Sequence, residues 1–189
     1  MQSILLYVVV ALTLMFATPE KTKPEVCLSA EEFKIYEQLN AYRKQYKLPK
    51  IPLSASMTIV AQAHAKDLQD NQPVKGNCNL HSWSDKGEWT ACCYTNDHAQ
   101  AKCMWDKPRE LSKYKGDGFE ISYWQSDGAN ANAAIAGWKK STPHNNMMIN
   151  RDIWKKLTWN ACGVGLYGNY AVVWFGREKD PAGEAKKCQ

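Results

Sequence analysis

The sequence lacks several features that would place it in a well-defined class. It has no internal repeat and no long low-complexity tract, so it carries no signature of a repeat or fibrous protein. No hydrophobic run reaches the roughly 20 residues that a transmembrane helix needs. The net charge of +5 comes from scattered lysines and arginines rather than from one basic block. A nucleic-acid partner is therefore not indicated, although weak attraction to anionic surfaces fits that charge.

The N-terminus carries the longest apolar run, Ile4–Phe16, which is too short for a stable membrane span. It fits the apolar core of a secretory signal with cleavage after Ala17, so residues 1–17 are predicted to be a signal peptide. No Lys or Arg precedes the run, and Lys21 and Lys23 follow it, so an uncleaved anchor is the alternative. We expect a secreted or extracellular protein, with a periplasmic protein or one retained by its N-terminal segment as the alternative.

Seven cysteines follow this run, which together with an export signal favours disulfide bonds. Because the number is odd, at least one thiol is free or pairs between chains. Adjacent Cys92 and Cys93 are expected to bond to different partners, and Cys103 is near enough to close a small loop with one of them. A zinc knuckle is the alternative, although no C-x-x-C pair occurs. The other cysteines are Cys27, Cys78, Cys162 and Cys188.

About 170 residues remain after the predicted signal peptide, which is enough for one domain. The first half of this remaining chain has clear helix signals. Residues 29–32, Ser-Ala-Glu-Glu, form a capping box and predict a helix that ends before Leu48. Ser54 is the expected N-cap of a second helix, whose apolar stripe runs from Met57 to Leu68.

The second half of the chain predicts an irregular segment and then a sheet. Periodicity is absent between residues 71 and 118, which contain four cysteines, so we expect a segment held by disulfides. A strand is predicted at Gly118–Trp124 and a helix at Asn130–Trp138. A hairpin follows at Ala161–Tyr167 and Tyr170–Phe175, with a two-residue Gly-Asn turn. Helices before a hairpin indicate an α+β layered domain with an antiparallel sheet.

Six short motifs occur in a fixed order along the chain. They are Leu39-Asn40-Ala41-Tyr42-Arg43, Ala61-Gln62-Ala63-His64-Ala65, Leu80-His81-Ser82, Gly118-Phe119-Glu120-Ile121, Ser141-Thr142-Pro143-His144-Asn145 and Cys162-Gly163-Val164-Gly165. In this order they resemble the motifs of the CAP superfamily, which contains cysteine-rich secretory proteins, antigen five and plant pathogenesis-related proteins, and they resemble its bacterial type. The resemblance extends from about Glu32 to Phe175.

The resemblance implies a three-layer α-β-α sandwich with a central antiparallel sheet. Residues 28–176 would form a single CAP domain, also called an SCP-like domain. Residues 71–118 would be a cysteine-rich insertion that is unusual for the family. The composition of residues 177–189, which are charged and contain Pro181 and Gly183, separately predicts a loose tail that Cys188 could tie down.

The resemblance also implies a cleft lined by His81 and His144. These two imidazoles would hold a divalent metal, zinc or another, weakly, with water completing the shell. Glu120 is the first family acid and is expected to orient an imidazole, bind the metal or accept a proton. Ser141 stands where many relatives have a second acid, and it is interpreted as a helix-ending hydroxyl of the ligand cleft. Met147 is expected to pack on the sheet or to form an apolar cleft wall.

The remaining histidines and tryptophans are assigned structural roles. His64 lies on an apolar helix face and is interpreted as a hydrogen-bonded core histidine, whereas His98 is expected to be exposed. The tryptophans invite a carbohydrate-stacking hypothesis, with Trp105 among the candidates for a contact surface. Packing under a loop is favoured over that role.

Three functions compete. The favoured one is a secreted binding module for a small amphipathic ligand, such as a lipid or sterol, or for a cell-surface glycan. This follows from what the resemblance implies, and it assigns no catalytic residue. The first alternative is a metal-dependent hydrolase, in which a cleft-bound water attacks an ester or amide. The second is a structural or defence protein whose histidine cleft is only a relic of the fold.

Overall fold

The computed structural model describes residues 26–189. The predicted signal peptide, residues 1–17, lies outside the described residues, as does the apolar run Ile4–Phe16. Between residues 26 and 189, no helix combines the length and the apolar character that crossing a membrane requires.

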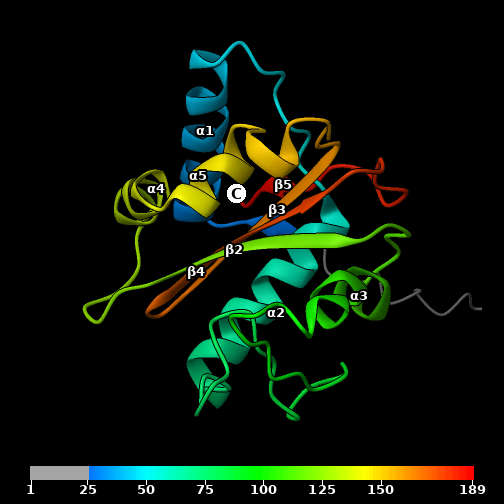
Figure 1. The fold of residues 1–189 in the computed structure, drawn as a ribbon. Helices are drawn as coiled ribbons and strands as arrows, with labels where there is room; N and C mark the ends of the chain where they lie inside the picture. The colour runs from blue at the N-terminus through cyan, green and yellow to red at the C-terminus, as the bar shows by residue number, and fades with distance from the viewer. Residues whose placement is uncertain (1–25) are drawn as a thin grey trace, which may run out of the picture.

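A three-stranded antiparallel sheet forms the centre of the molecule (Figure 1), with the strand order β2-β4-β3. Strand β2 (Gly118–Trp124) pairs with β4 (Tyr170–Gly176), which also pairs with β3 (Ala161–Tyr167). Gly168, at φ +56°, lets the chain reverse between β3 and β4. The predicted strand and hairpin are therefore confirmed, because alternating apolar residues on both sides of a two-residue turn specify this pairing.

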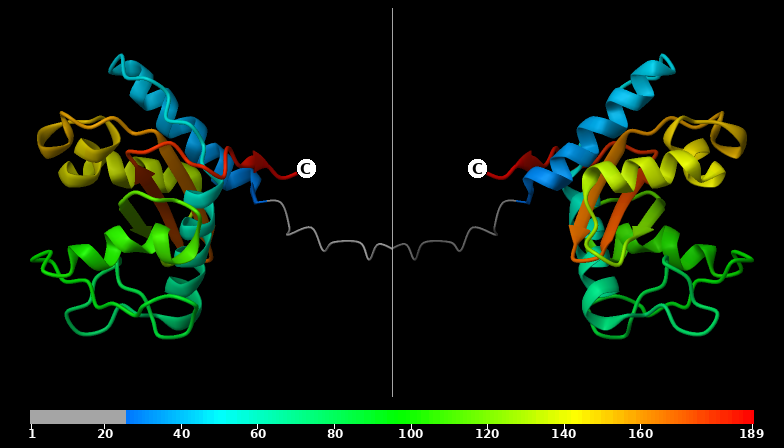
Figure 2. Two further views of the ribbon diagram at one scale, coloured as in Figure 1. Left: turned by 90° about the vertical axis from the view of Figure 1, so that its right-hand side faces the viewer. Right: turned by 90° about the vertical axis from the view of Figure 1, so that its left-hand side faces the viewer.

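Helices cover both faces of this sheet, as the two side views in Figure 2 show. Helices α1 (Ala30–Gln45), α4 (Ala131–Lys140) and α5 (Thr142–Met148) lie on one face. Helices α2 (Ala55–Asn71) and α3 (Ala101–Leu111) lie on the other. The predicted α+β fold with an α-β-α sandwich is confirmed.

Strand β4 contributes side chains to both hydrophobic cores, one on each face of the sheet. Val173 and Phe175 belong to the core on the α1 side, whereas Val172 and Trp174 belong to the core under α2. All four are fully buried, and burial of such a side chain stabilises a fold by roughly 1.5–3 kcal/mol. Because side chains alternate across a strand, one apolar strand holds the two helical layers together.

The helix starts follow the local sequence signals. Ser29 Oγ accepts a hydrogen bond from the Glu32 backbone N–H, and the Glu32 carboxylate accepts one from the Ser29 N–H. Ser54 Oγ caps α2 by accepting from the Met57 N–H at 2.9 Å. Both predicted caps are confirmed, because a cap depends on residues only two or three positions apart.

Helix α2 approaches β3 closely, and a glycine permits this contact. A Cβ atom built on Gly163 would lie 2.1 Å from the backbone carbonyl carbon of Met57 and 2.2 Å from the nitrogen of Thr58. Only a residue without a side chain fits there. This close contact sets the distance between α2 and the sheet, and therefore also the distance of His64 from the sheet.

The cysteine-rich segment, residues 71–118, is held by two disulfides, Cys78–Cys93 and Cys92–Cys103. Adjacent Cys92 and Cys93 therefore have different partners, as predicted. The segment is not irregular throughout, because α3 lies inside it. Its N-cap residue, Gln100, makes no side-chain cap hydrogen bond, and Pro108 lies within the helix, so the usual helix signals are weak.

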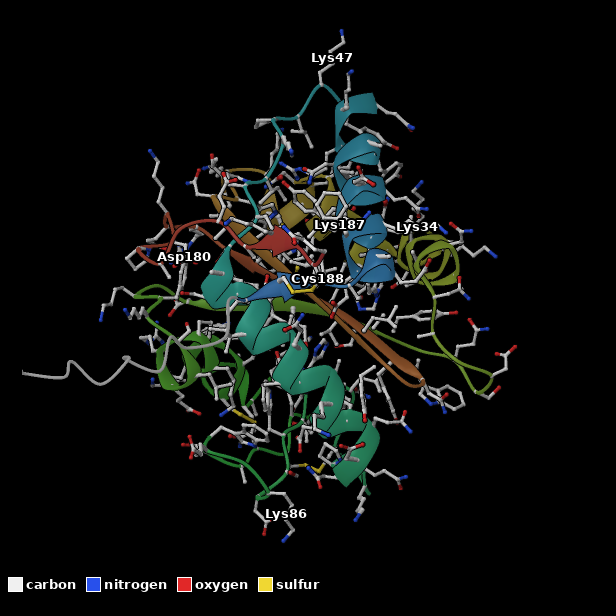
Figure 3. All side chains as sticks on the ribbon, turned by 180° about the vertical axis from the view of Figure 1, so that it is seen from behind. Lys34, Lys47, Lys86, Asp180, Lys187 and Cys188 are labelled. Carbon is white, nitrogen blue, oxygen red and sulfur yellow. A yellow bond between two sulfur atoms is a disulfide. The ribbon has the colours of Figure 1, made fainter. Side chains whose placement is uncertain are left out.

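The two ends of the described chain lie side by side. Strand β1 (Cys27–Leu28) pairs in parallel with β5 (Lys186–Lys187), and the Cys27–Cys188 disulfide joins them. Figure 3 shows Cys188 and Lys187 beside the first residues of the described chain. Asp180 also accepts hydrogen bonds from the backbone N–H and the hydroxyl of Ser56, at the start of α2. These contacts place residues 177–189 against the domain.

The seventh cysteine, Cys162, is the free thiol and is fully buried in β3. Burial raises its pKa to about 12, and the nearby charges of Arg43 and Lys50 lower it less than burial raises it. The thiol is therefore protonated and unreactive at neutral pH. It acts as a small apolar side chain in the core.

Candidate functional site

A cavity of about 590 Å³ opens where β2, α3, α5 and the cysteine-rich segment meet. We call it the cleft. Its volume is within the roughly 300–1,000 Å³ that is usual for small-ligand sites. A second hollow, of about 460 Å³, lies beside the cysteine-rich segment and the end of α2 and contains none of the predicted site residues. The cleft is lined by Asn79, His81, Tyr94, Asn96, His98, Ala101, Met104, Trp105, Phe119, Glu120, Ser141, Thr142, Pro143, His144, Asn146, Met147, Asp152, Ile153 and Trp154.

Glu120 is the centre of the polar end of the cleft. It lies on β2 and is only 2% exposed, although it lines the cavity. One carboxylate oxygen, Oε1, is hydrogen-bonded to His64 Nδ1. The other, Oε2, lies 2.7 Å from His81 Nδ1. The carboxylate therefore joins α2, β2 and the cysteine-rich segment.

The charge on Glu120 is set by opposing effects. Burial raises the pKa of this carboxyl, but the charge and hydrogen bond of His64, and then those of His81, lower the pKa to about 2. Glu120 is therefore ionised at neutral pH, and both of its oxygens accept hydrogen bonds. A carboxylate with both oxygens engaged is poorly placed to take a proton from water.

The ring of His81 is held in one orientation. Its Nδ1 faces Glu120, and Ser122 Oγ lies 3.2 Å from the same nitrogen. An ionised carboxylate only accepts, so Nδ1 carries the proton and donates it. The Tyr94 ring meets His81 edge-on, with centroids 5.3 Å apart. His81 Nε2 is therefore the nitrogen left for a ligand.

His144 enters the cleft from the opposite side, on the short helix α5. Its ring makes no hydrogen bond with any other residue between 26 and 189. Burial lowers the pKa of His144 to about 4, with a further lowering by the charge of His81 and a partial opposing effect of Glu120. At neutral pH the imidazole is uncharged and keeps a free lone pair.

Helix α5 is fixed by a buried arginine of α1. The guanidinium of Arg43, only 1% exposed, donates to the backbone oxygen of Met148 at 2.6 Å and to Asn150 Oδ1 at 2.7 Å. Sequence periodicity did not predict α5, since the preceding helix was expected to end near Ser-Thr-Pro. That helix does end at Ser141, but Pro143 fits the first turn of a new helix, where no N–H is needed.

The structure brings the predicted site residues together. His81, His144, Glu120, Ser141 and Met147 all line the cleft. Ser141 separates α4 from α5, and its backbone N–H donates to the Gly137 oxygen. Met147 is 8% exposed and presents an apolar side chain to the cavity.

Other cleft residues were assigned different roles from the sequence. His64 is a fully buried, hydrogen-bonded core histidine, as expected, but it also binds the site carboxylate. His98 is exposed, as expected, yet its Nδ1 lies 3.0 Å from the Tyr94 hydroxyl at the edge of the cleft. Only the fold could show these contacts, because the partners are far apart in sequence or lie in a segment without periodicity.

Aromatic side chains form the apolar wall of the cleft. The Phe119 ring lies 6.4 Å from that of Trp105 and 5.4 Å from that of Trp154, between centroids. Trp105 is 39% exposed, in contrast to Trp138 and Trp174, which are almost fully buried. The wall therefore faces the cavity rather than the core.

The donor set for a metal is small. Among residues 26–189, no group of three or more His, Cys, Asp or Glu side chains is arranged to hold a metal ion. His81 and His144 each have an available ring nitrogen at the polar end of the cleft, His98 has one at its exposed edge, and Glu120 is already engaged by hydrogen bonds. Such a pair fits weak binding of a divalent ion that keeps water in its shell, and it does not fit a structural zinc site.

Comparison with known proteins assigns the family. Residues 36–176 match the model of the CAP family, described as the cysteine-rich secretory protein family. The match covers most of the chain, so the chain belongs to this family. No match is found among curated proteins.

Two solved bacterial structures share the fold. An outer surface protein from Borrelia burgdorferi aligns with a TM-score of 0.53 and 19% identity, over 79% of this chain and 95% of that chain. An extracellular protein containing an SCP domain, from Bacillus anthracis, aligns with a TM-score of 0.51 and 19% identity. That alignment covers 78% of this chain but only 40% of the Bacillus anthracis chain, so this chain spans less than half of its length. At these identities the likeness establishes the fold alone.

Proposed function

We propose that this protein is an extracellular CAP domain whose cleft binds a small amphipathic ligand, a lipid, a sterol or a surface glycan, without turning it over. The observation that carries this proposal is the two-sided lining of the cleft. Trp105, Phe119 and Trp154 form an apolar wall, and His81 and His144 form a polar end. A cavity that pairs an apolar wall with a few convergent polar groups is typical of small-ligand sites.

The charge arrangement favours binding over hydrolysis. Both oxygens of Glu120 are engaged by His64 and His81, so the site carboxylate is not free to activate a water molecule. Ser141 has neither His81 nor His144 as a hydrogen-bond partner within residues 26–189. A nucleophilic serine needs such a base in contact. The polar end is therefore better suited to hold a polar head group or hydroxyl than to cleave a bond.

The wall predicts how binding responds to mutation. Trp105→Ala removes an aromatic face that is 39% exposed, and we expect probe affinity to fall by about tenfold or more, since a stacked ring contributes roughly 1–3 kcal/mol. Trp124→Ala is the matched control, because Trp124 is 51% exposed at the end of β2 and does not line the cleft. Fluorescent fatty acid, fluorescent sterol and a chitin oligosaccharide would be titrated into each protein. Equal affinities of the two variants for every bound probe would contradict the proposal that the aromatic wall contacts the ligand. Conversion of a bound probe to product would contradict a binding role without turnover.

We further propose that His81 and His144 take up a divalent metal, zinc or another, weakly in the same cleft. Support comes from the Glu120 carboxylate behind His81, because metal-binding histidines commonly donate their second ring N–H to a carboxylate. A bound zinc would supply Lewis acidity at the polar end. Zinc titration by calorimetry should give weak binding that is lost in His81→Ala and in His144→Ala but kept in His98→Ala. Binding that survives both single cleft variants would contradict this site.

A further inference from the structure

The turn that follows α5 carries a strongly exposed aliphatic side chain. Ile153, in the 3₁₀ helix η1 (Asp152–Trp154), is 75% exposed, the largest exposed fraction of any large hydrophobic residue between 26 and 189. Ile153 and Trp154 both line the cleft, so the exposed side chain stands at its opening. A single exposed aliphatic residue is ordinary on a protein surface, and its neighbours decide whether it has a role.

The turn is held in a defined shape. Asn150 and Asp152 have φ values of +49° and +54°, a left-handed conformation that costs energy in residues other than glycine. Asn150 Oδ1 accepts a hydrogen bond from the buried guanidinium of Arg43, and its side-chain amide donates to the backbone oxygen of Leu157 at 2.9 Å. These contacts fix the turn to the core while Ile153 stays at the surface.

Basic side chains flank Ile153 on both sides. Arg151, Lys155 and Lys156 are all exposed, and Asp152 is the one acidic residue between 151 and 156. These six residues therefore carry three positive formal charges and one negative charge. The side chains of Lys155 and Lys156 make no hydrogen bond or ion pair with any residue between 26 and 189, so no carboxylate in contact compensates them.

The basic and aromatic surface continues from this turn over the end of α1. The guanidinium of Arg151 lies 5.0 Å from the centroid of the Tyr46 ring, which is 38% exposed. The Tyr46 ring meets that of Tyr42 edge-on at 5.1 Å, and Lys139 Nζ of α4 lies 4.1 Å from the Tyr42 centroid. Tyrosine, lysine and arginine are the residues that commonly sit where a membrane meets water.

We propose that Tyr46, Arg151, Ile153, Lys155 and Lys156 form a docking patch with which the protein binds the surface of an anionic lipid bilayer. The basic groups attract anionic head groups, and the isoleucine enters the boundary between head groups and acyl chains. A polyanion without apolar groups, such as a nucleic acid or an acidic glycan, would leave the isoleucine uncovered. The inference goes beyond the proposed function and does not require it, although docking would place the cleft opening at the bilayer.

Vesicle sedimentation tests this surface on the exported protein. Vesicles of phosphatidylcholine alone, or of phosphatidylcholine mixed with phosphatidylglycerol, would be incubated with the protein and collected. We expect binding to be about tenfold or more stronger to the anionic vesicles and to fall as salt is added, because salt screens charges at the surface. No binding to the anionic vesicles, or equal binding to both compositions, would overturn the proposal.

Two variants separate the apolar and the charged parts of the patch. Ile153→Ser removes the aliphatic side chain, and the double variant Lys155→Gln with Lys156→Gln removes two charges. Each should weaken binding to the anionic vesicles by roughly tenfold. All three side chains are exposed, so the variants should fold, and thermal melting would verify this. Unchanged binding of either folded variant would overturn the docking patch.

Matched controls lie at the other end of the molecule. Val74→Ser changes a valine that is 39% exposed, and Lys75→Gln with Lys86→Gln removes two exposed charges from the cysteine-rich segment. Figure 3 shows Lys86 at the opposite end of the molecule from Lys47, which follows Tyr46. The control variants should bind the anionic vesicles like the wild type. Equal losses in the control and patch variants would mean that net charge alone attracts the protein, and would overturn the patch.

The test is independent of ligand binding in the cleft. A lipid drawn into the cleft without docking would give vesicle binding that the change at Lys155 and Lys156 leaves intact, and this result would overturn the proposal. No probe is needed, so a failed titration of the fluorescent sterol would count against the proposed function alone. Loss of vesicle binding with intact sterol binding would count against the docking patch alone.

Discussion

Three histidines lie close to one carboxylate, and each has different hydrogen-bond partners. His64 is buried between Glu120 and Ser82, His81 is held by Glu120 alone among charged groups, and His144 has no hydrogen bond within residues 26–189. Burial opposes a positive charge that has no hydrogen-bond or ion-pair partner. His144 is therefore the histidine of the cleft whose protonation should cost stability.

The pH dependence of the unfolding free energy tests whether protonation of His144 costs stability. The pKa of His144 is lowered to about 4, whereas the unfolded chain keeps about 6.5. Between these values the unfolded state binds more protons, so the stability that neutral His144 permits is present above about pH 6.5 and is lost as the pH falls towards 4. At about 1.4 kcal/mol per pH unit, we expect a loss of up to about 3 kcal/mol.

Urea denaturation of wild-type protein and His144→Gln across this pH range would measure the effect. The variant should lose less stability on acidification than the wild type. His98→Gln, which changes an exposed histidine, serves as the control and should follow the wild type. Parallel pH profiles for wild type and His144→Gln would show that this residue does not titrate as described.

At the scale of elements, the contact between α2 and β3 determines where His64 meets Glu120. Gly163→Ala would place a methyl group 2.1 Å from the Met57 backbone, which cannot move without moving the helix. Overpacking of this kind costs typically about 1–3 kcal/mol and sometimes more. We expect a clear loss of unfolding free energy and a weakened His64–Glu120 contact. The ¹⁵N chemical shifts of the His64 ring nitrogens, measured by nuclear magnetic resonance, would report the weakened contact.

Gly76→Ala is a useful comparison for that experiment. Gly76 has a positive φ of +60°, but a Cβ there would meet no atom within 4 Å. Its substitution should cost only the roughly 1–2 kcal/mol of a left-handed residue and leave the His64 shifts unchanged. An equal or smaller cost at Gly163 would show that α2 and β3 separate more easily than the structure indicates.

At the scale of the whole molecule, the disulfides differ in the length of chain that they close. Cys27–Cys188 spans 161 residues and joins the two ends of the described chain, whereas Cys92–Cys103 spans 11. In the chain-entropy model the long loop stabilises the fold by about 5 kcal/mol and the short one by about 3 kcal/mol. Replacing both cysteines of a pair by serine should therefore lower the melting temperature more for the long loop.

The short loop, closed by Cys92–Cys103, should affect ligand binding in the cleft more than the long loop does. Cys103 anchors the first turn of α3, which carries Trp105, so its removal is expected to weaken probe binding with a smaller effect on melting. Calorimetry of both serine pairs with the same fluorescent probes would separate the two effects. A larger melting shift for the short loop would contradict the entropic argument.

The sequence alone was sufficient for features that depend on near neighbours or on motif order. The capping box at Ser29, the cap at Ser54 and the hairpin around Gly168 were predicted because their partners lie within a few residues. The order of six motifs predicted the family and the α-β-α layers. Helices α3 and α5 were not predicted, since the first lacks a side-chain cap and the second has only seven residues.

The tertiary structure alone decided which side chains meet. His64 and Glu120 are 56 residues apart, and Tyr42 reaches Asn145 across 103 residues. The pattern of α2 correctly indicated a buried histidine, because periodicity reports which face is inside. It could not indicate the carboxylate opposite, because the approach of α2 to the sheet depends on packing at Gly163 and on the shared register of three strands.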